Sequence, residues 1–293
     1  MYDTIEAYLE ALKNEMQGSD AALVRDAMAD AREHLSLALE ASREQSPDMP
    51  EAEALKSIID EYGTPEETAS AYREIERRTS PALTQAPKRE TILGRIFGAY
   101  VDPRTWGSLL FMFITFVTGL IYFIWVVTGA SLSVSLLILI IGVPFAILFL
   151  VSVQGLALLE GRLVEALLGE RMPRRPSFAQ PGLKWLERLK ALVTDKRTWL
   201  AMLYMLLQLP LGIIYFTLNV TLLTLAFGFM AAPFVQIFWH VPVLSLTYGP
   251  VFLPYWGLIL MAVGGFALLT LAMHLVRGIG WLHGRYAKWV LGS

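Results

Sequence analysis

Cysteine is absent from the sequence, and charged side chains are absent from two long stretches of it. The lack of cysteine excludes disulfide bonds and thiolate chemistry. No Asp, Glu, Lys or Arg occurs in residues 105–159 or in residues 198–276. One helical crossing of a bilayer takes about 20 apolar residues, so each stretch has room for at least two crossings. The sequence therefore predicts a mainly α-helical, multi-pass protein of the plasma membrane.

The remaining charges are unevenly distributed. The 293 residues are 55% hydrophobic and 17% charged, and the mean hydropathy is +0.50. Residues 1–79 hold 19 acidic and 8 basic side chains, a net charge of −11, whereas residues 80–293 hold 7 acidic and 16 basic ones, a net charge of +9. This asymmetry indicates two parts in different surroundings. The acidic part would repel phosphates, so direct nucleic-acid binding is not expected.

Residues 1–79 have the apolar periodicity of four short helices. The clearest helix start is Thr64-Pro65-Glu66-Glu67, where Thr64 can cap, Pro65 suits the first helical position and Glu67 completes a capping box. The first residues are acidic and amphipathic, unlike a signal peptide, which predicts a cytoplasmic domain. Its acidic faces suit solvated helix surfaces or, alternatively, a docking surface for a basic partner.

Three segments of this domain, "YLEALKNEM", "REHLSLALE" and "EALKSIIDEYGTPEETASAYR", resemble the HAAS signalling domain. The resemblance covers roughly residues 4–78. It implies a small helical module at the cytoplasmic N-terminus of a bacterial or archaeal membrane protein. Genes for such modules often lie beside genes for PadR-type transcription regulators, so the resemblance implies a PadR-like cytoplasmic partner. It provides no catalytic residues.

After a Pro-containing linker at residues 80–90, the chain repeats itself. "DPRTW" at 102–106 matches "DKRTW" at 195–199 at an offset of 93, and "LLEGRLVEALLG" at 158–169 matches "WLHGRYAKWVLG" at 281–292 at an offset of 123. The matches divide the chain into a first membrane repeat at 91–170, a cytoplasmic loop at 171–182 and a second membrane repeat at 183–293.

The repeated phrase fits the entry of a helix into a membrane. Each aspartate can cap a helix, each arginine marks the cytoplasmic side, and each tryptophan suits the headgroup region. A catalytic Asp–Arg pair is the alternative. The predicted membrane-interface anchors are Asp102, Arg104, Trp106, Asp195, Arg197 and Trp199. The segment "LKWLERLKALV" at 183–193 predicts an interfacial amphipathic helix, with Leu183, Trp185, Leu186 and Leu189 in its apolar part.

The apolar segments lie at about 106–124 and 137–158 in the first repeat, and at 199–217, 219–239 and 257–276 in the second. Three crossings in the second repeat would place the C-terminus outside, but basic residues follow the last segment and favour the cytoplasm. We therefore predict four crossings rather than five, both termini in the cytoplasm, and an outer insertion at about 234–256 that forms a loop.

Two short stretches alternate small polar and apolar residues with a period of two. They are "ASLSVSL" at 130–136 and "FTLNVT" at 216–221. This pattern predicts short β-hairpins at the outer face. Continuous helix is the alternative, because short apolar runs fit either structure.

The repeated region, with "GLIYF", "IIGVPF" and "LLEGRLVEALLG", resembles the sensor domain at the N-terminus of many actinobacterial sensor histidine kinases. Here the chain ends at Ser293 without the kinase region, so autophosphorylation is not the expected output. The four histidines lack metal-ligand spacing, and no catalytic or cofactor site is expected.

We predict a non-enzymatic membrane sensor that contacts lipids and a cytoplasmic regulator, with a homodimer as one assembly. A transport or export subunit that binds apolar compounds between the repeats is the alternative, because duplicated units with charge-free walls fit it as well.

Overall fold

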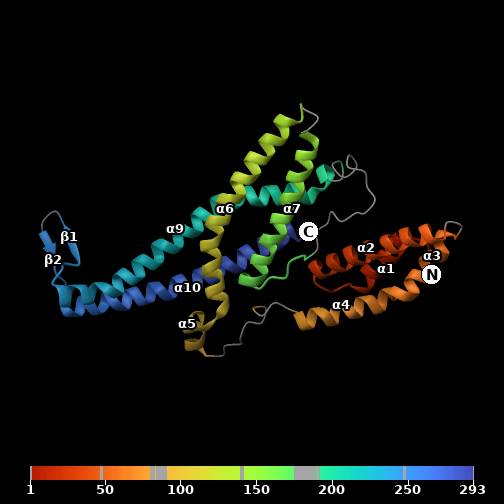
Figure 1. Ribbon diagram of the computed structural model, residues 1–293. Coiled ribbons are helices and arrows are strands. Elements are labelled where there is room, and N and C mark those ends of the chain that lie inside the picture. The colour runs from red at the N-terminus through yellow and green to blue at the C-terminus, as the bar shows by residue number, and fades with distance from the viewer. Residues whose placement is uncertain are drawn as a thin grey trace. The chain divides into compact units, whose positions relative to one another are not determined.

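The mainly α-helical prediction is confirmed by a computed structural model, which describes residues 2–46, 49–79, 83, 91–138, 142–174, 190, 192–246 and 249–292 (Figure 1). The chain forms two compact units. The first contains residues 1–84, 122–206 and 285–293, and the second contains residues 85–121 and 207–284. The helices of the described residues are α1 (Ile5–Glu15), α2 (Ala21–Gln45), α3 (Glu51–Tyr62), α4 (Pro65–Thr79), α5 (Ile92–Val101), α6 (Pro103–Leu136), α7 (Gly142–Leu168), α9 (Lys196–Trp239) and α10 (Tyr255–Leu291).

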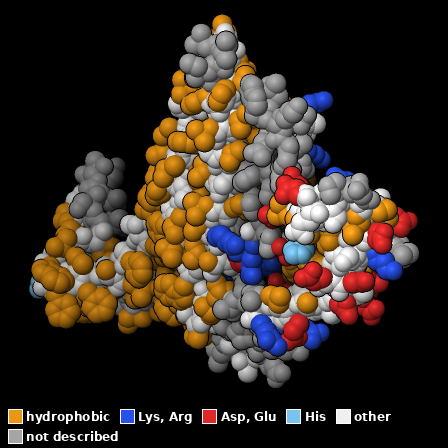
Figure 2. Space-filling model, turned by 45° about the vertical axis from the view of Figure 1, so that its right-hand side comes forward, with side chains coloured by type: hydrophobic (Ala, Val, Ile, Leu, Met, Phe, Trp, Pro, Cys, Tyr) orange, Lys and Arg blue, Asp and Glu red, His pale blue; other side chains and the backbone are white. Residues whose placement is uncertain are grey.

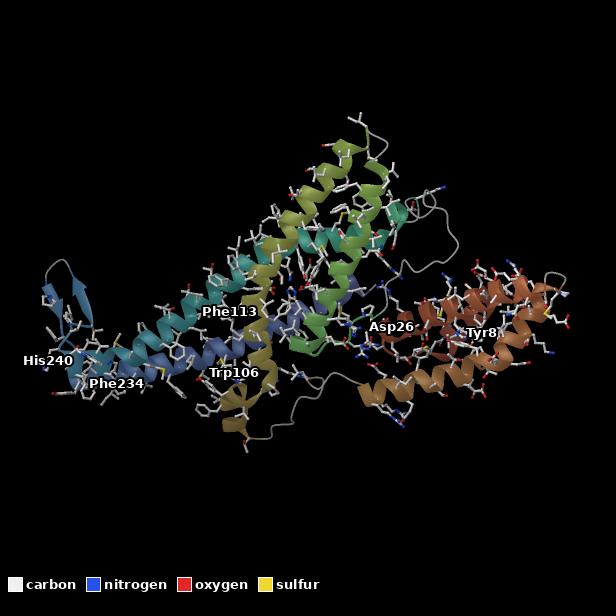
Figure 3. The ribbon with its side chains drawn as sticks, viewed as in Figure 1. Tyr8, Asp26, Trp106, Phe113, Phe234 and His240 are labelled. Carbon is white, nitrogen blue, oxygen red and sulfur yellow. The ribbon has the colours of Figure 1, made fainter. Side chains whose placement is uncertain are left out.

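Helices α1 to α4 pack around Tyr8, whose side chain is fully buried in the first unit (Figure 3). The Tyr8 hydroxyl donates to the Gly63 carbonyl at 2.9 Å and lies 3.0 Å from the Thr68 hydroxyl. Burial is possible because both contacts satisfy the phenol oxygen. The apolar stripes predicted from the sequence supply the rest of this core, which includes Leu9, Leu12, Met16, Ala27, Ala31, Leu35, Leu55 and Ile59.

The predicted capping box at the start of α4 is confirmed. The Thr64 amide and hydroxyl donate to Glu67 Oε2 at 2.9 and 3.0 Å, and the Glu67 amide donates to the Thr64 hydroxyl at 3.3 Å. Reciprocal bonds of this kind satisfy amides that have no partner within the helix.

Acidification is expected to loosen this helix start. The Thr64 amide, and then its hydroxyl, lower the pKa of Glu67 from the usual 4.5 by donating to its carboxylate. A carboxylate with a lowered pKa in the folded state stabilises that state above its unfolded pKa, and the contribution is lost as the pH falls through the folded pKa. NMR shifts of the Thr64 amide should therefore titrate below pH 4.5. In Glu67→Gln this titration should disappear, and its persistence would contradict the assignment.

Helices α6, α7, α9 and α10 are each long and apolar enough to cross a membrane, which agrees with the predicted number of crossings among the described residues. Their visible surfaces are covered by hydrophobic side chains, whereas Asp, Glu, Lys and Arg gather around the N-terminal helices (Figure 2). Continuous exposed apolar surface of this kind marks a membrane or an interaction site. The chain thus has the features of a multi-pass membrane protein.

Helix α9 joins two of the apolar segments into one. It runs from Lys196 to Trp239 with Pro210 and Pro233 inside it, so residues 199–217 and 219–239 are not separate elements. Prolines are tolerated in such helices because neighbouring groups satisfy the freed carbonyls. Asn219, where a break would be needed, is helical and 1% exposed.

The predicted β-hairpins at 130–136 and 216–221 are wrong. The first stretch ends α6 and the second lies inside α9. The serines do not require a strand, because Ser133 donates to the Gly129 carbonyl at 2.7 Å within the helix. A helix satisfies every backbone group internally, which an open sheet edge next to lipid cannot do.

Strands occur instead in the predicted outer insertion. Strands β1 (Leu244–Leu246) and β2 (Gly249–Val251) pair antiparallel, with Ser245 opposite Pro250. The insertion is also shorter than predicted, because α9 continues to Trp239 and α10 begins at Tyr255. The sequence prediction extended the loop over all of its prolines. Pro254, however, directly precedes α10, a position where the missing amide is not needed.

Within the second unit, α6 and α9 cross at reciprocal glycines. A Cβ atom on Gly119 would lie 2.6 Å from the Gln208 carbonyl oxygen, and a Cβ on Gly212 would lie 2.7 Å from the Thr115 carbonyl oxygen. The two glycines, like Thr115 and Gln208, are 93 positions apart. The contacts pair the helices in reverse order, so at this point α6 and α9 run in opposed directions.

Candidate functional site

The predicted helix caps of the repeated phrase are confirmed. Asp102 Oδ1 accepts from the Arg104 amide at 3.1 Å, and Asp195 Oδ1 accepts from the Arg197 amide at 3.0 Å.

The two tryptophans of the repeated phrase also make matching contacts. Trp106 Nε1 donates to the carbonyl of Tyr100, and Trp199 Nε1 donates to the carbonyl of Val193, both at 2.8 Å. Both indoles are more than half exposed (53% and 56%). These contacts fix each ring beside its helix start, while their depth in a membrane stays a prediction.

One of the two aspartate caps, Asp102, has a second partner that sequence reasoning missed. In the second unit, Arg277 Nη2 lies 3.3 Å from Asp102 Oδ2, and the Asp102 carboxylate is buried. In the first unit, Gln154 Nε2 donates to the Thr198 hydroxyl at 2.8 Å. Gln154 and Arg277 are 123 positions apart, which is the offset of the second sequence match. The two contacts are not equivalent, because Arg277 pairs with the cap Asp102, whereas Gln154 bonds to Thr198 rather than to the cap Asp195.

The other predicted site was the interfacial amphipathic helix. Leu183, Trp185, Leu186 and Leu189 lie outside the described residues.

A buried ion-pair network joins the N-terminal helices to the segment after α7 in the first unit. Arg171 is 8% exposed, and its Nη2 donates to Asp26 Oδ2 at 2.9 Å while its Nε donates to Glu76 Oε1 at 3.0 Å. The Arg174 amide donates to Asp26 Oδ1 at 2.7 Å, and the Arg174 side chain pairs with Glu165. The hydrogen bond that Arg174 donates to Glu165 raises the pKa of Arg174. Figure 3 shows Asp26 near the start of α2.

The end of α10 provides a second attachment. Lys288 Nζ pairs with Asp20 Oδ2, and Arg25 Nη1 donates to the Leu291 carbonyl at 3.0 Å. Carbonyls in the last turn of a helix have no partner within the helix and carry partial negative charge, so they attract cations. Together these contacts define what we call the junction, formed by Asp20, Arg25, Asp26 and Glu76 on one side and Glu165, Arg171, Arg174, Lys288 and Leu291 on the other.

A titratable residue is buried at matching positions of α7 and α10. In the first unit, the hydroxyls of Tyr122 and Tyr204 donate to the Glu160 carboxylate at 3.1 and 3.2 Å, and Glu160 is 1% exposed. In the second unit, His283 Nδ1 lies 3.1 Å from the Tyr215 hydroxyl, and the His283 ring packs on Phe111 at 4.8 Å between ring centres.

These contacts follow the offsets of the repeat. Glu160 corresponds to His283 at the offset of 123, while Tyr122 corresponds to Tyr215 at the offset of 93. The aromatic residues that complete the two sets, Phe111 and Tyr204, are also 93 positions apart. Sequence reasoning missed both titratable groups. The signal that could have found them is the exchange of Glu160 for His283 within two otherwise matching segments.

The comparisons with known proteins bear on the apolar helices. The family described as "Putative sensor" matches residues 113–291, which include α7, α9, α10 and most of α6. The chain belongs to this family. Comparison with curated proteins and comparison with solved structures each find no match. Membership of the Sensor family favours a non-catalytic role, and it concerns the apolar helices rather than α1 to α5.

The Sensor-family region also contains an apolar pocket in the first unit. Trp125, Gly129 and Leu132 of α6 and Phe145, Leu148 and Phe149 of α7 line it, and its volume is about 270 Å³. Its polar contact is internal, since Trp125 Nε1 donates to the Ser152 hydroxyl at 2.9 Å. Such a wall offers burial of apolar area rather than hydrogen bonds, so it suits an apolar compound or a lipid chain.

Proposed function

We propose that the protein is a non-enzymatic membrane sensor of the Sensor family, which relays an envelope condition or an apolar ligand to a cytoplasmic regulator. The observation that carries the proposal is the junction. A sensing element needs a physical link to its output, and here the N-terminal helices are attached to the chain just after α7 and to the end of α10. Family membership and the apolar pocket support the sensing half.

The chemistry of the junction suits a relay better than a permanent joint. Buried ion pairs contribute little net stability, because the charges lose their hydration, yet breaking one pair costs much. The network is therefore stable only in a narrow range of geometries. A shift in the position of α7 or α10 would change the free energy with which the N-terminal helices are attached. Released N-terminal helices would expose acidic groups that are now paired, including Asp26.

The partner class is a proposal that rests on the resemblance of residues 4–78 to HAAS domains. We propose a PadR-like transcription regulator as the recipient of the signal. The net charge of −11 on residues 1–79 favours a protein partner with a basic surface over direct contact with nucleic acid.

The relay can be tested by capturing partners from membranes in the presence and absence of stimulus. Full-length protein, a variant lacking residues 1–79, Arg171→Ala and Arg43→Ala should be compared, because Arg43 pairs with Glu51 on the exposed surface of the N-terminal helices. We expect deletion to abolish capture of the regulator, Arg171→Ala to make capture independent of stimulus, and Arg43→Ala to behave as wild type. An unchanged partner set after deletion would refute the relay. Flux in proteoliposomes would instead favour the export function.

The location of the chain ends is open to direct measurement. Because the sequence contains no cysteine, Ser293→Cys provides a single labelling site without background. Basic residues flank all four apolar helices, so we expect both ends on the cytoplasmic side and no reaction of intact cells with an impermeant maleimide. A second variant, Ser131→Cys near the end of α6, should react if its helix end lies outside. Labelling of the Ser293→Cys variant in intact cells would refute the predicted topology.

The same labelling experiment also bears on the crossing of α6 and α9 in opposed directions. If residues 102 and 195 are both cytoplasmic, the two helices must be strongly inclined to cross in opposed directions. The length of α9 agrees with inclination, because its 44 residues span about 66 Å, against a hydrocarbon core of about 30 Å. If residues 102 and 195 lie on opposite sides, the repeats are inverted.

A further inference from the structure

We propose that a cavity beside the junction binds the phosphate-bearing headgroup of an anionic, hydroxyl-containing phospholipid. The cavity lies in the first unit, where α2, α7, α9 and α10 meet. Its polar lining consists of Arg25, Gln154 and Arg197, and its apolar lining includes Ala157, Leu158 and Val290. The inference deepens the proposed function, because it names one chemical class that the sensor would recognise at the junction.

Two guanidinium groups from distant parts of the chain line the same small space. Arg25 belongs to α2, and Arg197 lies in the first turn of α9. Burial, and then the positive charge of Arg197, lower the pKa of Arg25 to about 10, against the opposing influence of Asp26 and Asp195. The two cations therefore repel each other inside a partly desolvated site. A phosphodiester between them would relieve this repulsion and accept charge-assisted hydrogen bonds from both planar guanidinium groups.

A buried amide oxygen, which needs a hydrogen-bond donor, is a second and independent feature of the cavity. Gln154 is 8% exposed, and its Nε2 is bonded to Thr198, but its Oε1 has no hydrogen-bond donor among the described residues. Gln154 also lines the cavity. Leaving a buried acceptor unpaired is costly, so the site favours a ligand that brings a donor. The hydroxyl of a glycerol headgroup, placed next to the phosphate, meets this requirement.

The size and walls of the cavity favour a lipid over a free anion. The free volume is about 50 Å³, where a single water needs roughly 10–15 Å³, so there is room for a phosphate group. Apolar side chains of α7, α9 and α10, which are long and apolar enough to span a membrane, line the wall together with Met172 and Pro173. A free phosphate would gain nothing from these walls, whereas a lipid continues into apolar surroundings.

The test uses full-length protein in nanodiscs of phosphatidylcholine with increasing phosphatidylglycerol, with retained lipid measured by native mass spectrometry. We expect wild type to retain phosphatidylglycerol and Arg25→Gln/Arg197→Gln to bind it at least tenfold more weakly. Arg104→Gln is the matched control, because Arg104 occupies the position of Arg197 in the first repeat. Arg25→Lys/Arg197→Lys keeps both charges and should retain part of the affinity, which separates lost binding from misfolding.

Two further measurements identify the chemical class of the ligand. Gln154→Met should remove the preference for phosphatidylglycerol over phosphatidic acid, which lacks the glycerol hydroxyls. Inorganic phosphate and soluble glycerophosphate at millimolar concentration should not displace the lipid. Equal retention by wild type and the double Gln variant would overturn the site, and displacement by phosphate would overturn the lipid assignment. Because these measurements contain no partner protein, a failed relay would leave them unchanged.

Discussion

Replacing Arg171 by alanine should open the junction. Arg171 is 8% exposed and contacts Asp26 and Glu76, and Asp26 is 6% exposed. Truncation would leave the Asp26 carboxylate buried without its guanidinium, and removing one partner of a buried ion pair typically costs about 3–5 kcal/mol. We expect amide hydrogens around Asp26 and residues 171–174 to exchange on the order of a hundredfold faster or more, because local opening becomes that much less costly. Hydrogen–deuterium exchange of the full-length protein in nanodiscs measures this.

Two comparisons make the result specific. Arg43→Ala breaks an ion pair of 2.6 Å whose side chains are more than half exposed, and pairs of that kind contribute about 1 kcal/mol or less. Its exchange rates near the junction should match wild type. Adding Asp26→Asn to Arg171→Ala removes the stranded charge and should recover part of the lost protection. Equal effects of Arg171→Ala and Arg43→Ala would show that the buried network does not hold the N-terminal helices.

The N-terminal helices were predictable because their signals are local. The apolar stripe around Leu9 and Leu12, and the capping box of Thr64 and Glu67, each depend on residues within one or two helical turns. The junction has no such signal. Arg171 lies in a basic stretch that resembles an ordinary solvated loop, and Asp26 is one of 19 acidic residues in residues 1–79. Their pairing across 145 positions depends on how α2 and α7 dock, which no local pattern encodes.

The strand error has a related cause. Alternation of serine with apolar residues predicts a strand when one face meets water, but within an apolar helix each serine can bond to a carbonyl one turn earlier, as Ser133 does. The period-two pattern therefore loses its meaning in this surrounding. The repeat was more informative than periodicity, since the caps Asp102 and Asp195, and the buried groups Glu160 and His283, all lie at its offsets.

Adding a single methyl group at Gly119 should disrupt the crossing of α6 and α9. In Gly119→Ala the new Cβ would lie 2.6 Å from the Gln208 carbonyl oxygen and 2.8 Å from its carbon, and both are backbone atoms that cannot rotate away. The helices would have to separate, and overpacking of this kind costs about 1–3 kcal/mol. Alanine favours a helix by up to about 1 kcal/mol over glycine, so the net loss is somewhat smaller. The thermal unfolding midpoint in detergent should fall by several degrees.

Neighbouring glycines provide the controls for this substitution. A Cβ on Gly264 of α10 meets nothing within 4 Å, whereas a Cβ on the adjacent Gly265 would lie 2.8 Å from the Ala226 carbonyl oxygen. Gly264→Ala should therefore leave the midpoint unchanged or raise it, while Gly265→Ala and Gly212→Ala should lower it. The Gly119→Ala/Gly212→Ala double variant should lose less than the sum of the single losses, because one separation of α6 and α9 relieves both clashes. Additive losses, or a wild-type midpoint for Gly119→Ala, would show that the helices do not meet at these glycines.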